Sequence, residues 1–167
     1  DSYAKVKAAV MPRVGERLVR AGGLGGTSGS FQTEHGPMSS LICGENANPL
    51  AVFVLTAEGV HIMRWPNHFR TSGDPIRNRV LVDSQAVAHV SKGYVVSVCR
   101  DMIRRLELSP ELGEFIGSKA YFGGSVVIDS NLRVIAGPIG AEEEIPYAEC
   151  ELETGVPMRL RHNLPWH

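Results

Sequence analysis

The stretch SSLICGENANPL, residues 39–50, places a cysteine between an apolar run and the start of a helix. The apolar run that ends at Ile42 predicts a strand that enters the core. The pair Asn48-Pro49 predicts a helix start, because asparagine caps free backbone N–H groups and proline loses no needed hydrogen bond at the first helical position. Cys43 is therefore expected at the end of a strand, in a sharp turn before a helix.

This placement makes Cys43 a candidate nucleophile. Gly44 is expected to permit the sharp backbone, and the turn would aim the helix dipole and its N–H groups at the sulfur, which favours the thiolate and stabilises an oxyanion. Packing is the alternative role of a cysteine at a strand end, and the residues alone leave both roles open. Cys99 and Cys150 lie in apolar segments and are predicted to be buried structural thiols. The three cysteines form no CxxC pair, which argues against a disulfide framework and a zinc site.

Hydrophobic periodicity and turn residues predict alternating strands and helices outward from Cys43. A hairpin of residues 31–34 and 38–43 precedes the helix that starts at Pro49. Further on, the pattern predicts a strand, a long helix, a strand, a short helix and three strands, at residues 60–65, 75–92, 94–99, 110–118, 123–129, 132–138 and 146–152. Such alternation predicts a single mixed α/β domain over residues 1–167, with the last three strands forming an antiparallel meander.

The composition is that of a globular protein. Of 167 residues, 43% are hydrophobic and 21% are charged, and the formal net charge is -1, which gives no electrostatic case for binding nucleic acid or an anionic membrane. No apolar run approaches the roughly 20 residues that cross a bilayer, and the N-terminus lacks the layout of a secretory signal, so the cytoplasm is the expected location. The glycine-rich residues 22–26 do not fit a dinucleotide-binding motif.

The order of elements and their end residues resembles the C-terminal half of the nitrilase, or carbon-nitrogen hydrolase, superfamily. The similarity covers nearly the whole chain and includes GERLV, LICGEN followed by NPLA, a strand ending in WP, YVVSVC, GGSVVID, VIAGP and YAECEL. The most specific part is C-x-E-N followed by N-P-L-A, which is similar to the nucleophile motif of nitrilases. The resemblance implies a four-layer α-β-β-α sandwich, of which this chain covers about the second half, and a Glu-Lys-Cys site with an additional glutamate.

The resemblance assigns catalytic roles to three residues. Cys43 matches the nucleophile, which would attack a nitrile or amide carbon and lead to an acyl thioester. Glu16 matches the additional glutamate, which would hold the lysine and position substrate or water. Lys7 is the candidate for the lysine that stabilises developing negative charge, although it lies one or two positions outside the usual spacing, and Lys5 is a weaker candidate.

The resemblance also assigns a substrate site. Trp65 and Pro66 match the segment that lines the substrate pocket, Asn67 lies just beyond them, and Glu45 is expected to orient the loop beside the substrate. The family's general-base glutamate lies in the N-terminal half, before residue 1. A dyad of Cys43 with His68 is the rival chemistry.

Hydrolysis of an organic nitrile to a carboxylic acid and ammonia is the leading predicted reaction. An amidase is the close alternative, because both reactions converge on the same thioester. A non-catalytic remnant or partial subunit is the alternative from a different class, motivated by the missing base and the displaced lysine. Half a sandwich leaves sheet faces and edges uncovered, so a homo-oligomer or a complementing N-terminal half is expected as partner. No metal or organic cofactor is expected, since the thiol supplies the chemistry.

Overall fold

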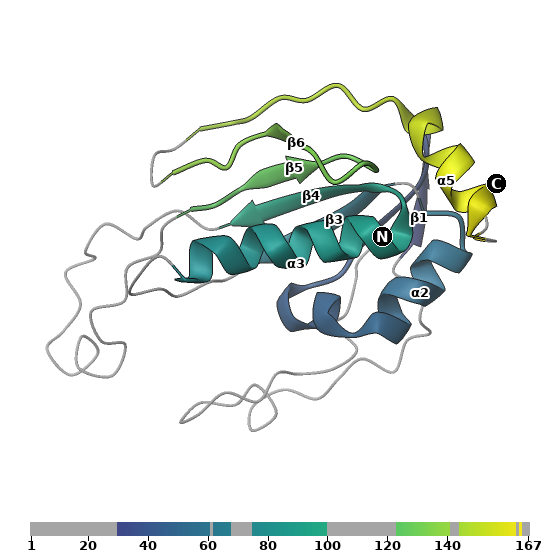
Figure 1. The fold of residues 1–167 in the computed structure, drawn as a ribbon, viewed down its shortest axis with the longest axis horizontal. Coiled ribbons are helices and arrows are strands. Elements are labelled where there is room, and N and C mark those ends of the chain that lie inside the picture. Colours follow the sequence, from purple (N-terminus) through teal and green to yellow (C-terminus); the bar gives the residue numbers. More distant parts are fainter. Residues whose placement is uncertain are drawn as a thin grey trace, which may run out of the picture.

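The structure of the protein is a computed structural model, drawn as a ribbon in Figure 1. It describes residues 30–60, 62–67, 75–99, 123–140, 144–162 and 164. These residues form a six-stranded sheet in the order β1-β2-β3-β4-β5-β6. The strands are β1 (Ser30–Thr33), β2 (Gly36–Ser40), β3 (Ile62–Asn67), β4 (Tyr94–Cys99), β5 (Val126–Ile128) and β6 (Val134–Ala136).

The first two strands form the hairpin that the sequence predicts. β1 and β2 pair antiparallel, with Thr33 opposite Gly36. Gly36 has a φ of 99°, a left-handed conformation that glycine adopts without steric cost. The second arm is shorter than expected, because β2 ends at Ser40 and not at Cys43.

Two strand–helix–strand units build the middle of the sheet. Helix α2 (Pro49–Ala57) connects β2 to β3, and helix α3 (Pro75–Ser91) connects β3 to β4. The three strands run parallel, as expected where helices link them. The predicted alternation of strand, helix, strand, helix and strand is therefore confirmed.

The ends of these helices carry the signals on which the prediction rested. Asn48 Oδ1 accepts the N–H of Leu50 at 3.1 Å, and Pro49 is the first residue of α2. Gly59, with a φ of 80°, follows the last turn of α2. Gly93 lies between the end of α3 and the start of β4, where the predicted helix stops.

β5 pairs antiparallel with β4, and β6 pairs antiparallel with β5. The turn between them is built on the buried carboxylate of Asp129, whose Oδ1 accepts the N–H of Asn131 at 2.9 Å and that of Arg133 at 2.8 Å. The Nε of Arg133 pairs with Asp129 Oδ2 at 2.7 Å. Two strands of the predicted meander are confirmed.

The third strand of the meander, predicted over residues 146–152, is wrong. Residues 144–151 form no strand, and the chain continues into the 3-10 helix η2 (Leu152–Gly155) and helix α5 (Val156–Arg161). Exposed and half-buried side chains do alternate here, with Ile145 73% and Tyr147 85% exposed. Among the described residues, however, no backbone hydrogen bond joins residues 144–150 to a strand, and Pro146 lacks the N–H that a ladder needs.

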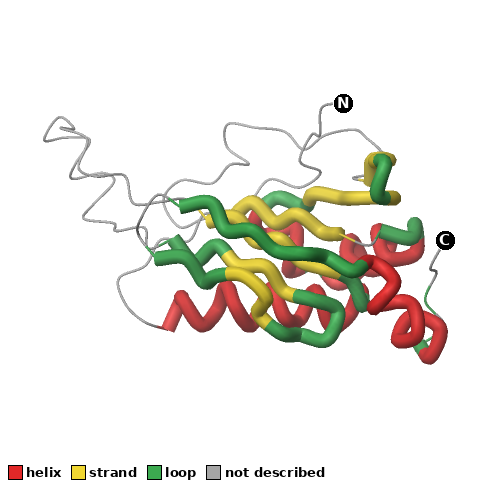
Figure 2. The backbone as a smooth tube through the Cα atoms, turned by 90° about the horizontal axis from the view of Figure 1, so that it is seen from above, coloured by secondary structure: helices red, strands yellow, loops and turns green. Residues whose placement is uncertain are grey.

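One face of the sheet is covered by helices. Figure 2 shows α3 lying along this face, and α2 packs against α3. The core beneath them is aliphatic and includes Val52, Leu55, Val87, Ala88, Val95, Val126 and Ile128. The α/β class is confirmed, with one sheet and one helical layer in the described part of the chain. No helix among these residues combines the length and apolar character that a membrane span requires.

Candidate active site

The three parallel strands end at one edge of the sheet, where α/β proteins usually bind ligands. β2 ends at Ser40, which pairs with Arg64, and β3 ends at Asn67, which pairs with Cys99 of β4. Cys43 opens the short 3-10 helix η1 (Cys43–Ala47), which contacts β3. The fold therefore brings the backbone of Cys43 to the edge where β3 ends.

The turn at Cys43 differs from the expected elbow in two ways. The strand stops at Ser40, and η1 lies between Cys43 and α2, so the N-terminus of α2 does not directly follow the cysteine. Gly44 does not adopt a left-handed φ, and a Cβ placed on it meets no described atom within 4 Å. The expectation that Gly44 permits a sharp backbone here has no basis in its conformation, because the backbone at Gly44 suits any L-residue.

Two buried side chains of η1 hold the residues that precede Cys43. The N–H of Ile42 donates to Glu45 Oε2 at 2.9 Å, and Nδ2 of Asn46 donates to the carbonyl oxygen of Leu41 at 2.7 Å. Glu45 is 8% exposed and Asn46 is 5% exposed. The carboxylate of Glu45 thus faces its own loop, and its orienting role stays a prediction.

The other predicted site residues are placed in part. Trp65, Pro66 and Asn67 form the last half of β3 and pair with residues 97–99 of β4. Glu16, Lys7, Lys5 and His68 lie outside the described residues. Glu34 lies exposed in the β1–β2 turn, at the end of β2 remote from Cys43.

Cys99, at the end of β4, has the character of a structural thiol. Its side chain is half-buried, and its backbone N–H donates to Ser125 Oγ at 2.9 Å. Burial raises the pKa of the Cys99 thiol to about 11, against the lowering effect of a hydrogen bond with Ser97. The thiol is therefore protonated at neutral pH and is a poor nucleophile. Burial also raises the pKa of Cys150, which is free and half-buried.

Residues 2–159 match the profile of the family described as carbon-nitrogen hydrolase. The chain belongs to the carbon-nitrogen hydrolase family. A nitrilase of Bradyrhizobium diazoefficiens is 29% identical to it over 147 residues, which make up 86% of this chain and 44% of the relative. The resemblance seen in the sequence is confirmed at the level of the family.

Solved structures share the fold of this carbon-nitrogen hydrolase chain. A carbon-nitrogen hydrolase from Helicobacter pylori has a TM-score of 0.78 at 21% identity, over 94% of this chain and 54% of that one. An amidase from Nesterenkonia sp. AN1 has a TM-score of 0.69 at 16% identity, over 98% of this chain and 57% of that one. The chain spans about half the length of the curated relatives it matches, 44% of one and 49% of another.

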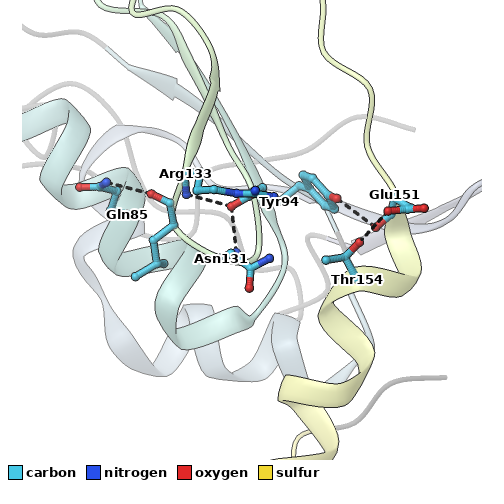
Figure 3. A network of polar contacts seen from close by, with 8 residues as sticks. Gln85, Tyr94, Asn131, Arg133, Glu151 and Thr154 are labelled. Carbon is cyan, nitrogen blue, oxygen red and sulfur yellow. Dashed lines mark hydrogen bonds and ion pairs between the residues drawn. The ribbon is translucent and has the colours of Figure 1, made fainter.

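The polar network of the carbon-nitrogen hydrolase chain in Figure 3 lies away from the candidate site. The hydroxyl of Tyr94, at the start of β4, donates to the carbonyl oxygen of Glu151 at 2.9 Å, and Thr154 Oγ1 contacts Glu151 Oε2 at 3.3 Å. Gln85 of α3 donates to the carbonyl oxygen of Leu132 at 3.0 Å. These contacts fasten η2 and the β5–β6 turn at the edge opposite Cys99, so their role is structural.

Asn46 is the functional candidate that the sequence reasoning missed in this carbon-nitrogen hydrolase chain. Its position in C-x-E-N was the available signal, but an asparagine two residues before a helix cap also suits an ordinary polar loop. Only the burial of Asn46 and its hydrogen bond to the Leu41 carbonyl oxygen distinguish it from an ordinary polar loop residue. Within the described residues, no group of three or more His, Cys, Asp or Glu side chains is arranged to hold a metal ion.

Proposed function

We propose that this chain supplies the nucleophile-bearing half of a thiol hydrolase that converts organic nitriles to carboxylic acids and ammonia. The observation that carries the proposal is the position of Cys43, in a held turn at the carboxyl edge of the parallel strands, within a region that matches the family profile. The nitrile substrate follows from the C-x-E-N motif and from a relative that is named a nitrilase.

The proposed reaction runs through two covalent intermediates. The Cys43 thiolate adds to the nitrile carbon and the nitrogen takes a proton, which gives a thioimidate. Water adds to this carbon, ammonia leaves, and an acyl thioester remains. A second water then releases the carboxylic acid and restores the thiol, so that two waters are consumed for each nitrile.

The other groups of the site have supporting roles in this proposal. Lys7 would stabilise the negative charge that develops on the substrate, and Glu16 would hold that ammonium and position substrate or water. Trp65, Pro66 and Asn67 would line the pocket from the end of β3. The general base would come from a glutamate outside residues 1–167, since proton transfer is needed at both stages.

A missing half of the sandwich would supply that glutamate and cover the open sheet face. Val98 is 42% exposed on the face of β4 opposite Val95, and Phe31 is 39% exposed on the same face, in the register row of Tyr94. An N-terminal half with a second sheet and helical layer would complete the four-layer sandwich. On the outer side of the helices, Leu50 and Phe53 are 73% and 54% exposed, which supports pairing of subunits through helix faces.

An amidase is the second candidate, because the fold of this chain also matches an amidase structure with a TM-score of 0.69. An amide would form a tetrahedral intermediate in the first step where a nitrile forms the thioimidate. Both substrates lead to the same acyl thioester, so the pocket decides between them.

The test measures ammonia release from aliphatic, aromatic and arylaceto nitriles and their amides. The protein assayed is this chain together with an N-terminal half, and the variants are Cys43→Ala and, as the matched thiol control, Cys99→Ala. We expect turnover that only Cys43→Ala abolishes. Preference for amides would select the amidase, and no turnover with any substrate would select the non-catalytic partial subunit.

A further inference from the structure

We infer that Asn46 and Glu45 are positioning residues that fix Cys43 by holding the two residues before it. This inference rests on the proposed role of Cys43 as nucleophile. The bond from Asn46 Nδ2 to the Leu41 carbonyl oxygen is 2.7 Å long, and the bond from the Ile42 N–H to Glu45 Oε2 is 2.9 Å long. Cys43 thus lies inside a loop that its own downstream side chains close.

The side chains are needed because backbone bonds alone hold this turn weakly. Leu41 and Ile42 follow the end of β2, and η1 is a 3-10 helix of five residues, a geometry with poorly aligned hydrogen bonds. Two backbone bonds contribute, from the Glu45 N–H to the Ile42 oxygen at 3.2 Å and from the Asn48 N–H to the Glu45 oxygen at 3.0 Å. Neither of them reaches Leu41, whose carbonyl oxygen is satisfied by Asn46.

Burial makes the loss of either hydrogen bond costly. Glu45 and Asn46 are 8% and 5% exposed, and Leu41 is 7% exposed and belongs to the hydrophobic core. Removal of one partner would leave a buried polar group without a hydrogen bond, which the turn relieves only by moving. Since Leu41 is anchored in the core, the movement would fall on Ile42 and Cys43.

A small displacement of the nucleophile has a large effect on the reaction. Misplacement of a reacting group by about 1 Å lowers the rate by about a hundredfold, while remote contacts with the substrate remain. Loss of the Asn46 bond should therefore lower kcat by about ten- to a hundredfold and leave KM within about twofold. Glu45 acts here as an acceptor for a backbone N–H and transfers no proton.

The experiment compares four variants: Asn46→Ala, Glu45→Ala, Glu45→Gln and the control Asn131→Ala. Glutamine keeps an acceptor oxygen for the Ile42 N–H, so Glu45→Gln should rescue most of the kcat that Glu45→Ala loses. Asn131 is an exposed asparagine in the β5–β6 turn, so its truncation should leave kcat unchanged. Thermal unfolding identifies any variant that does not fold.

A second readout does not depend on turnover. Alkylation of Cys43 by iodoacetamide is followed across pH by peptide mass spectrometry, with Cys150 in the same sample as internal reference. In Asn46→Ala and Glu45→Ala the Cys43 rate should change by at least about fivefold relative to Cys150, because the sulfur leaves its held position. In Glu45→Gln the rate should return towards the wild-type value.

The outcomes separate this inference from the proposed function. A folded Asn46→Ala with wild-type kcat and a wild-type alkylation profile would overturn the positioning role. A Glu45→Gln variant with as low a kcat as Glu45→Ala would overturn it too, because a proton-transfer role would then be indicated. If the alanine variants do not fold, a folded but inactive Glu45→Gln variant would overturn the positioning role for the same reason. Ammonia release that survives Cys43→Ala would instead sink the proposed function, while the alkylation profiles would still report on the turn.

Discussion

The β5–β6 turn provides the sharpest test of the fold, because one buried carboxylate organises it. Asp129 is 3% exposed and accepts the N–H groups of Asn131 and Arg133 through Oδ1, at 2.9 and 2.8 Å. Asp129→Ala removes both of these hydrogen bonds at once. The ion pair with Arg133 adds little, because the Arg133 side chain is 72% exposed and its own charge is solvated.

The magnitude follows from the two backbone bonds. A hydrogen bond to a charged group contributes about 1.5–3 kcal/mol, and exposed residues such as Asn131 recover part of this from water when the acceptor is lost. We therefore expect Asp129→Ala to lower the free energy of unfolding by about 3 kcal/mol. At about 2–4 °C per kcal/mol for a chain of this size, Tm should fall by about 10 °C.

The assay is urea-induced unfolding followed by tryptophan fluorescence, at fixed protein concentration because association also changes apparent stability. Asp129→Asn is the matched control, since its Oδ1 still accepts the two N–H groups. Its free energy of unfolding should fall by about half as much as that of Asp129→Ala. If Asp129→Ala unfolds within about 0.5 kcal/mol of the wild type, the carboxylate does not organise the turn and the reasoning fails.

Two further predictions concern thiol chemistry and glycine packing. Burial raises the pKa of Cys99 from 9.0 to about 11 in the folded chain, so its contribution to stability is complete below pH 9 and is lost as pH rises through about 11. Across this range, the free energy of unfolding should therefore fall less steeply with pH for Cys99→Ala than for the wild type. Gly155→Ala should lower the free energy of unfolding by about 1–3 kcal/mol, since its Cβ would clash with the carbonyl oxygen of Lys92. In the same urea titration, the free energy of unfolding of Gly44→Ala should lie within about 0.5 kcal/mol of the wild-type value. Equal losses for the two glycine variants would contradict the packing argument.

Local signals in the sequence predicted helices α2 and α3 and the parallel strands well, but not helix α5, and the helix predicted over residues 110–118 lies outside the described residues. Asn48 and Pro49 start α2, Gly59 follows its end, and Gly93 follows α3, each through a backbone preference that depends on neighbouring residues alone. Where pairing decides the structure, the local pattern was insufficient. Residues 146–152 alternate like a strand but form no ladder, because a strand also needs a partner edge that no local signal specifies.

The sequence predicted where Cys43 lies in the fold, after the second arm of the hairpin and before α2, but not the local geometry of its turn. The motif identified Cys43, and topology explains why the turn after β2 meets the end of β3. The strand ends early because Glu45 and Asn46 take the N–H of Ile42 and the carbonyl of Leu41, which a continued ladder would use. Side chains that compete in this way with the sheet for backbone bonds depend on burial, which a single sequence does not display.

The sequence of β4 carries the strongest argument that this chain is completed by another layer. YVVSVC is apolar on both alternating faces, a pattern typical of strands that are buried on both sides. Val95 is 0% exposed beneath the helices, but Val98 on the opposite face is 42% exposed. A strand whose composition suits two covered faces, but which leaves Val98 exposed on one of them, is expected to bind a second layer. Curated relatives of about twice the length leave room for that layer, so we expect an N-terminal half to reduce the exposure of Val98 and Phe31 together.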